Sequence, residues 1–533
     1  MAKIVLINPR FETSFWSMHH SLSIFGRDAM TPTSALTLLA ALTPLDHEVR
    51  LIDEAVEPID ETALLAADIV GLTGMIVQRD RMRAIAKQVK ALGKFLVVGG
   101  PWITVQEDYL DGLADVIFVG EADQTWPVFL REWAAGHHAV RYEQADRTDM
   151  TTLPRPRNDL LRLDRYLQGS IQISRGCPYL CEFCDIIVTF GRQPRVKSAD
   201  QVIAELDDWH RAGVGAVFLV DDNLIGNRKA LIPILERLAE WQREHGYIIS
   251  LHTEASLNLA DDEELLEHFV AANIRTVFVG IESPNPAALL ETRKFQNVET
   301  RKQRLEPSQA EAEAFLISRI HRIQQKGIKV TCGLILGFDA DTPAIFDSHR
   351  RLLRQSGILH AMVGLLSAIP KTPLHARLQR EGRLDESDPP AFGTNVIPAQ
   401  MTREELSRGY LALIDETFTP EAYFDRLDDL YLQRRFYGHA ESVRVPNIPQ
   451  WLQVKYLLIS WFFTAFMLAK LLVHIKDWEL RGFYLKRLLR FIAARPYPMR
   501  IFDYVMESAC HYHFHRFARD MVRRRTGIIN TFG

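Results

Sequence analysis

The stretch RGCPYLCEFC, residues 175–184, decides how the rest of the chain is understood. It places Cys177, Cys181 and Cys184 at C-x3-C-x2-C spacing, directly after an apolar run that predicts a β-strand. Three thiolates this close together can hold one iron–sulfur cubane, whereas a [4Fe-4S] cluster normally takes four cysteines. The spacing therefore predicts a [4Fe-4S] cluster in which one iron is open to a non-protein ligand.

The two remaining cysteines, Cys332 and Cys510, lie far from this group in apolar stretches that are typical of inert buried thiols. An odd total of five cysteines, three of them within eight residues, also argues against a disulfide framework. A structural zinc site is the alternative. It would need a fourth Cys or His nearby, and the next histidine downstream is His210.

The N-terminal part of the chain alternates short apolar runs with helical patterns. This alternation predicts a parallel, doubly wound sheet of the flavodoxin-like kind, in which a ligand lies beyond the carboxyl ends of the strands. The predicted strands are Ile4–Ile7, Val49–Ile52, Ile69–Thr73, Phe95–Val98 and Val116–Val119. Because Met1–Pro9 reads as a buried strand rather than a signal peptide, we expect a cytoplasmic protein.

The alternation resumes after residue 166 and yields about six strand–helix units, which predicts a partial (β/α)6 barrel. Its strands are predicted at Ile171–Ser174, Val217–Val220, Ile249–His252, Val277–Gly280, Val330–Leu334 and Met362–Leu365. The polar stretch Thr292–Glu311 predicts an exposed loop that runs into a helix. The domain prediction is an α/β domain at 1–140, a linker at 141–166, the barrel at 167–385, a helical region at 386–450 and an apolar, basic helical tail at 451–533.

The cysteine motif after a first barrel strand resembles the signature of the radical S-adenosylmethionine (SAM) enzymes. The resemblance covers roughly Ile171–Leu378 and implies that SAM fills the open iron site. Several side chains at later strand ends match the places where this family contacts SAM. The implied SAM-binding residues are Phe183, Asp221, Asp222, Glu254, Glu282 and Gly337.

The N-terminal domain resembles the cobalamin-binding domain that precedes the barrel in one large class of radical SAM enzymes, the class B methylases. The implied cobalamin-binding residues are Thr73, Gly74, Met75, Gly99, Gly100, Pro101, Thr104, Gly120 and Glu121. The chain departs from the D-x-H-x-x-G motif that supplies a histidine below cobalt in many cobalamin domains. It carries only Asp46-His47-Glu48, so no cobalt ligand is expected from this motif.

These resemblances imply a cobalamin-dependent radical SAM C-methyltransferase that acts on an unactivated carbon of a hydrophobic small molecule. An electron donor of the flavodoxin or ferredoxin type is implied as well. The alternatives are an oxidative ring cyclase of the same layout, which transfers no methyl group, and a methylase of a tetrapyrrole. Five stretches resemble the hopanoid C-2 methylases most: 169–172, 184–187, 191–195, 221–230 and 370–374.

The C-terminal segment from Trp451 to Gly533 carries fourteen Lys/Arg and five Asp/Glu, against a net charge of −4 for the whole chain. Within it, Tyr456–Ala469 is uncharged and aromatic, but shorter than the ~20 residues that cross a bilayer. A buried core helix is the favoured interpretation. The alternative is an interfacial helix, with peripheral membrane contact through 451–500 at the inner face of the membrane. No nucleic-acid partner is expected, because no RNA-binding module is found.

Two groups of histidines invite a functional reading. His19 and His20 are expected in the long loop after the first strand, either touching cobalt or substrate or serving packing. His511, His513 and His515 could be metal ligands, but the spacing places only the first and last on one helix face. A solvated or partner-facing surface is the favoured interpretation for this second group.

Overall fold

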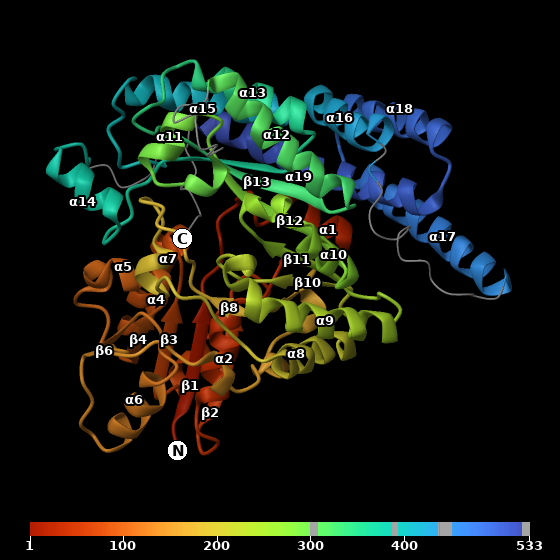
Figure 1. Cartoon of the computed structure of the whole chain (residues 1–533). Coiled ribbons are helices and arrows are strands. Elements are labelled where there is room, and N and C mark those ends of the chain that lie inside the picture. Colours follow the sequence, from red (N-terminus) through yellow and green to blue (C-terminus); the bar gives the residue numbers. More distant parts are fainter. Residues whose placement is uncertain (299–307, 386–392, 435, 437–449, 525–533) are drawn as a thin grey trace.

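The computed structural model describes residues 1–298, 308–385, 393–434, 436 and 450–524, with side chains omitted for 450–457. Parts of the predicted segments 292–311, 386–450 and 451–533 lie outside these residues. Two parallel sheets and a group of C-terminal helices make up the fold (Figure 1). The N-terminal sheet is red and orange, the second sheet green, and the last helices blue.

The N-terminal sheet has the strand order β2-β1-β3-β4-β5-β6, all parallel. Its strands are β1 (Lys3–Asn8), β2 (Glu48–Asp53), β3 (Ile69–Thr73), β4 (Phe95–Gly99), β5 (Val116–Val119) and β6 (Arg141–Glu143). The strand order runs one way from β1 to β2 and the other way from β3 onward. The boundary between β1 and β3 is therefore the switch point at which flavodoxin-like sheets bind ligands. The sequence analysis assigns β6 to the linker, because three residues give too short a pattern to reveal a strand.

Alternation along each strand explains why helices cover both faces of this sheet. Ile4 and Leu6 pack against one group of helices, whereas Val5 and Ile7 pack against the other, as successive side chains of a strand point to opposite faces. The first group contains α2 (Ser34–Leu42) and α6 (Thr125–Ala134). The second contains α3 (Glu61–Ala66), α4 (Arg79–Ala91) and α5 (Pro101–Val105).

The second sheet has the order β14-β13-β12-β11-β10-β7, so six parallel strands follow one another in chain order. They are β7 (Gly169–Ile171), β10 (Ala216–Leu219), β11 (Ser250–Glu254), β12 (Ile274–Glu282), β13 (Lys329–Leu336) and β14 (Ala361–Leu365). Helices connect and cover them: α8 (Ala199–Arg211), α9 (Arg228–Glu244), α10 (Glu263–Ala271), α12 (Gln309–Gln325) and α13 (Ile345–Ser356). This confirms the predicted fold class of a doubly wound sheet, a partial (β/α)6 barrel and a helical C-terminal region.

The C-terminal helices are α15 (Arg403–Thr417), α16 (Pro420–Asp428), α17 (Gln450–His474), α18 (Trp478–Ala494) and α19 (Pro498–Arg524). α19 contacts α15, α16, α17 and α18, and also the short N-terminal helix α1 (His19–Phe25). Residues separated by nearly 500 positions are therefore neighbours: the His20 backbone N–H donates to His513 Nδ1 over 3.3 Å.

Two sequence-based interpretations of this region are wrong. His511 and His513 are fully buried rather than solvated, because α19 lies in the interior of the helical region. His19 and His20 begin α1 rather than lying in a loop; the ring of His20 packs against that of His513, whereas His19 is exposed. The favoured core-helix interpretation of 456–469 also fails, since Leu458, Phe462 and Phe463 are exposed. Within the described part of the chain, no helix is both long and apolar enough to cross a membrane.

Candidate active site

A short antiparallel pair, β8 (Ser174–Arg175) with β9 (Arg195–Val196), brackets the loop that carries the three cysteines. Gly176 starts the loop with φ +98°, and a Cβ there would lie 3.0 Å from the Gly191 carbonyl oxygen. Its N–H donates to Asp222 Oδ2 over 2.7 Å. The tight turn therefore needs glycine, and it ties the cysteine loop to the end of β10.

The environment of the cysteine sulfurs fits a cluster. Burial raises the pKa of Cys177 and raises that of Cys184 well above its usual value, so thiolates need positive charge beside them. Two side-chain amides contact the sulfurs: Asn223 Nδ2 lies 3.8 Å from Cys177 Sγ, and Gln296 Nε2 lies 3.8 Å from Cys181 Sγ. Such hydrogen bonds to sulfur are one way in which proteins adjust iron–sulfur clusters.

A buried ion pair lies beside the same loop. Lys294 Nζ is 2.7 Å from Glu282 Oε1, and both side chains are buried. Burial favours the neutral amine, but Glu282 and the sulfur of Cys181 hold the pKa of Lys294 above its usual value. The predicted exposed loop at 292–311 is thus wrong for its first part, since Lys294 and Asn297 are buried against the end of β12. Residues 299–307 lie outside the described residues.

Glu282 ends β12 in an unusual backbone conformation. Its φ is +66°, and the pairing of β12 with β13 shifts register between Gly280 and Glu282. A left-handed non-glycine residue is strained and occurs preferentially at functional sites. Its second oxygen, Oε2, is buried and has no hydrogen-bond partner among the described residues. The carboxylate is therefore presented toward something that the chain itself does not supply.

Three further carboxyl groups gather at neighbouring strand ends. Burial raises the pKa of Asp221 to about 7 and that of Asp222 to about 6. The pKa of Glu254 is raised to about 8, mainly by burial and to a lesser degree by repulsion from Asp222 and Asp221. Asp221 Oδ2 has no hydrogen-bond partner in the described chain. Buried carboxylates that repel one another fit a cationic ligand, and the ammonium and sulfonium groups of SAM are cations.

The two other predicted SAM contacts lie on either side of this group. Phe183 is buried with its ring 6.0 Å from that of Phe338. Gly337 ends β13 with φ +103°, and its N–H donates to Asp341 Oδ2 over 2.9 Å. The structure thus brings all the predicted SAM residues to the carboxyl ends of β10, β11, β12 and β13 or to the cysteine loop.

The predicted cobalamin residues line the carboxyl ends of β3, β4 and β5. The backbone segments at these strand ends lie close to one another: a Cβ on Gly100 (φ +94°) would lie 2.2 Å from Thr73 Oγ1, so this position needs glycine. Thr104 Oγ1 donates to the Gly100 carbonyl over 2.9 Å and accepts the Gly120 N–H over 2.9 Å. Gly74, Met75, Gly99 and Pro101 complete this edge.

Two buried donors near this edge, Trp102 Nε1 and Thr125 Oγ1, have no hydrogen-bond partner in the described chain. A glycine-rich strand edge at the switch point, with unpaired donors beside it, fits a large ligand that carries amide groups. Glu121 has another role in this structure, since its carboxylate is occupied by arginines of the cysteine region.

Arginines join the two strand-end edges. Arg175 Nη1 lies 3.1 Å from Glu121 Oε1 and 2.5 Å from Asp123 Oδ2, and all three side chains are buried. Arg195 Nη2 reaches Glu121 Oε1 over 2.8 Å. At the other side, Lys371 Nζ donates to the Thr104 carbonyl over 2.6 Å. The carboxyl ends of the two sheets therefore face one another, with the cysteine loop between them.

Comparison with known proteins identifies this arrangement. A family model described as "Radical SAM superfamily" matches residues 171–353, and one described as "Domain of unknown function (DUF4070)" matches 372–526. An uncharacterized methyltransferase from Synechocystis sp. is 37% identical over 84% of this chain and 82% of its own length. A hopanoid C-2 methylase from Rhodopseudomonas palustris is 35% identical over 84% of this chain and 82% of that protein.

The chain belongs to the radical SAM methyltransferases. A solved structure of the cobalamin-dependent SAM radical enzyme OxsB has the same fold, with a TM-score of 0.59 at 16% identity over 98% of this chain and 81% of that one. Membership in the radical SAM family implies a [4Fe-4S] cluster and SAM. The chain is accordingly an enzyme.

Three side chains beside the cysteines are not among the site residues predicted from the sequence: Asn223, Lys294 and Gln296. Asn223 follows the two predicted aspartates directly, and its amide oxygen also accepts the Ser256 N–H over 3.1 Å. That position was a recognisable signal. Lys294 and Gln296 lie in a polar stretch that looks exposed, and only the fold brings them to the cysteines.

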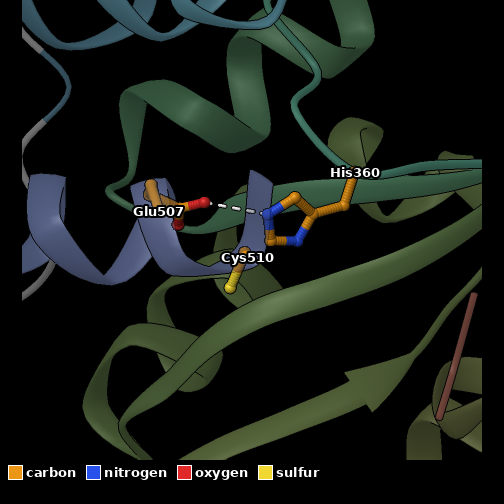
Figure 2. A group of neighbouring side chains, drawn as sticks. All are labelled: His360, Glu507 and Cys510. Carbon is orange, nitrogen blue, oxygen red and sulfur yellow. Dashed lines mark hydrogen bonds and ion pairs between the residues drawn. The ribbon is translucent and has the colours of Figure 1, made fainter. Parts of the chain in front are cut away.

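A second cluster of polar side chains lies at the opposite, amino-terminal ends of the barrel strands (Figure 2). The carboxylate of Glu507, on α19, has two close partners: His360 Nε2 lies 2.8 Å from Oε2, and Lys329 Nζ lies 2.8 Å from Oε1. Cys510 lies beside this group. Despite burial, Lys329 and His360 hold the pKa of Glu507 well below its usual range, while burial raises that of Cys510 to about 12.

His, Cys and Glu are metal-ligating residue types, but the charges of this cluster are already balanced. Tyr423 donates its hydroxyl to Glu507 Oε2 over 3.1 Å, and none of these side chains has an unpaired buried polar atom. We therefore assign this cluster a structural role, fixing α19 against the start of β13 and the residue before β14.

Proposed function

We propose that this methyltransferase is cobalamin-dependent and methylates an unactivated carbon of an apolar small molecule, with a hopanoid as the first substrate to test. The observation that carries the proposal is the position of Arg175. It lies at the end of β8, directly before the cysteine loop, and is ion-paired to Glu121 and Asp123 after the end of β5. The loop for the cluster and the edge for cobalamin are thereby held next to one another.

In this proposal Cys177, Cys181 and Cys184 hold the cluster, and Asp221, Asp222, Glu254 and Glu282 surround SAM. When bound and reduced, the cluster would supply the electron for the reductive cleavage of SAM, and a methylated corrinoid would supply the methyl group that is transferred. Asn223 and Gln296 orient the cysteine sulfurs by their hydrogen bonds. Lys294 forms an ion pair with Oε1 of Glu282, and Oε2 stays available to a cationic ligand.

The N-terminal edge contributes binding rather than proton transfer. Thr73, Gly74, Met75, Gly99, Gly100, Pro101, Thr104 and Gly120 would contact the corrinoid through backbone and hydroxyl groups, and Glu121 would hold the arginines behind it. No histidine from a D-x-H-x-x-G motif is available, and His47 instead accepts the Ala2 N–H over 3.1 Å. The side chains of this edge therefore position the corrinoid without a cobalt ligand from that motif.

The substrate class rests on the 35% identical relative that is named a hopanoid C-2 methylase and on the five stretches that resemble such enzymes. Reduction of the cluster would come from a flavodoxin- or ferredoxin-type donor. The test is an anaerobic incubation of the reconstituted protein with methyl-labelled SAM, a reductant and either a hopanoid or a magnesium tetrapyrrole.

Labelled methyl in the hopanoid would support the proposal in full. Label in the tetrapyrrole would keep the methyl transfer and replace the substrate. Consumption of SAM with an oxidised acceptor that carries no label would contradict methyl transfer and favour the ring-cyclase type.

A further inference from the structure

Helix α17 exposes an apolar surface that the rest of the described chain does not cover. Leu458 and Phe462 are 64% and 68% exposed, and Val473 is 79% exposed. Together with Phe466 and Ala469 these residues follow one another at spacings of four, four, three and four, so they form one stripe along the helix. Trp461 and Phe463 widen the stripe on both sides and are also exposed.

The opposite face of α17 is the one that anchors the helix. Thr464, Leu471 and Ile475 are buried, and α17 packs against α19 and α1. In Figure 1 one end of α17 projects beyond the other helices at the right of the molecule. The exposed stripe is therefore a surface of a well-anchored helix, and it contains no charged residue. Single exposed apolar side chains are ordinary, whereas a continuous aromatic stripe indicates an interaction surface.

Helix α18, which follows α17 in the chain, exposes apolar side chains of its own. Trp478 and Leu489 are 78% and 65% exposed, and Leu485, which shares their helix face, is exposed too. Two consecutive helices therefore each present an apolar face. We call these two faces together the α17–α18 surface, with Leu458, Trp461, Phe462, Phe463, Phe466, Val473, Trp478, Leu485 and Leu489 as its apolar members.

The charges around the α17–α18 surface select its partner. Residues 458–500 contain eight Lys/Arg and two Asp/Glu. Lys476, Lys486 and Arg490 are exposed, and the ammonium of Lys470 lies 5.3 Å from the centre of the Phe466 ring. One of the two acidic side chains, Asp477, caps α18 by accepting the Glu479 N–H over 2.9 Å. Aromatic and aliphatic side chains bordered by cations are typical of helices that lie in the interface of an anionic bilayer.

We infer that the α17–α18 surface docks the enzyme on an anionic membrane, with the aromatic stripe of α17 inserted among the lipid headgroups. This inference gives a partner to the apolar surface, and it does not depend on the methyl-transfer chemistry. It is compatible with a substrate that resides in the bilayer. Binding to lipid can be measured without SAM, cluster or substrate, so its outcome is separate from that of the proposed function.

The experiment is flotation of the full-length protein with vesicles of phosphatidylglycerol and phosphatidylcholine, compared with phosphatidylcholine alone. Wild-type protein is expected to float with the anionic vesicles. Phe462→Ser/Phe466→Ser is expected to weaken partitioning by about tenfold or more, because it removes inserted apolar area. Lys476→Gln/Lys486→Gln is expected to weaken it about twentyfold at low salt, with a smaller effect at high salt.

The matched control is Val140→Ser/Ile248→Ser, which removes two exposed apolar side chains from other faces of the molecule. This variant should float like the wild type. Equal flotation of the Phe462/Phe466 variant and its control would overturn the inference. So would a wild-type protein that ignores vesicles and dimerises in light scattering through Phe462 and Phe466, since the surface would then bind a second copy of the chain.

Discussion

Two groups of ionisable side chains lie at opposite ends of the barrel strands. They differ in how many of their polar atoms have a hydrogen-bond or ion-pair partner. At the carboxyl ends, Asp221 and Glu282 each keep an oxygen without a partner in the described chain, and Glu254 has a raised pKa. At the amino ends, Glu507 is paired with Lys329 and His360. Burying an unsatisfied charge is costly, so it persists where a ligand supplies the missing partner. We therefore propose that the first group is the ligand site and that the second is a structural link.

Replacement of Cys181 by alanine tests this contrast with the largest expected effect. The variant should lose the cluster and all formation of 5'-deoxyadenosine from SAM, because two cysteines cannot hold the cubane. Iron content and the deoxyadenosine assay measure this. Cys510→Ala is the matched change in the structural group and should retain wild-type iron. Equal losses in both variants would erase the distinction between the two groups.

Glu507→Gln should mainly affect stability. The substitution leaves the partly buried ammonium of Lys329 without its counter-charge, which costs about 3 kcal/mol of unfolding free energy. Denaturant titration of the protein without cofactors measures this. Glu254→Gln serves as the comparison: its carboxylate form is disfavoured by burial and by repulsion from Asp222 and Asp221, so its removal should not lower stability. A larger loss for Glu254→Gln would reverse our assignment of the two groups.

Lys294→Met should weaken SAM binding by about 10–100-fold, as changes just outside a metal site commonly do. Without the ammonium, the Glu282 carboxylate would lose the ion pair that fixes its position toward the ligand. Equilibrium dialysis of the reconstituted protein against SAM measures the affinity. Lys87→Met, at an exposed position of α4, is the control. If the two variants bind SAM alike, Lys294 has no part in the site.

The raised pKa of Glu254 predicts a pH dependence of about tenfold in SAM affinity. Its pKa of about 8 means that the carboxylate form is gained as the pH rises from 6.5 to 8.5, so binding should tighten in that direction. SAM itself also titrates, so its affinity is measured against pH for both the wild type and Glu254→Gln. The difference between the two slopes is the contribution of Glu254. Parallel profiles for the two proteins would show that Glu254 does not meet the ligand charge.

Most residues of the proposed site could be picked out in the sequence because they belong to local motifs at strand ends, and the structure places these motifs near one another. Each of these motifs stands at or just after the end of an apolar strand: the three cysteines, Asp221-Asp222 and Glu254. Parallel strands bring their carboxyl ends to one edge of the sheet. Lys294 and Gln296 could not be found this way, since they come from a polar stretch whose burial depends on packing against β12. The same limit applies to Glu121, whose ion pair with Arg175 joins segments 54 residues apart.

The C-terminal region was the least predictable part. Hydrophobic composition alone favoured burial of 456–469, yet the aromatic side chains of α17 are exposed while the histidines of α19 are buried. Which face of a helix is covered depends on its neighbours, and the neighbours of α19 include α1 from the other end of the chain. Sequence periodicity carries no information on such long-range contacts.

The most direct test of the central claim is an anaerobic reconstitution. The protein is loaded with iron, sulfide and hydroxocobalamin, desalted, and its visible spectrum is recorded before incubation with SAM and dithionite. Our account predicts retained corrinoid bands together with 5'-deoxyadenosine. Deoxyadenosine from a protein that retains no corrinoid would contradict the cobalamin-dependent methyl transfer, and retained corrinoid without any cleavage of SAM would contradict the radical chemistry.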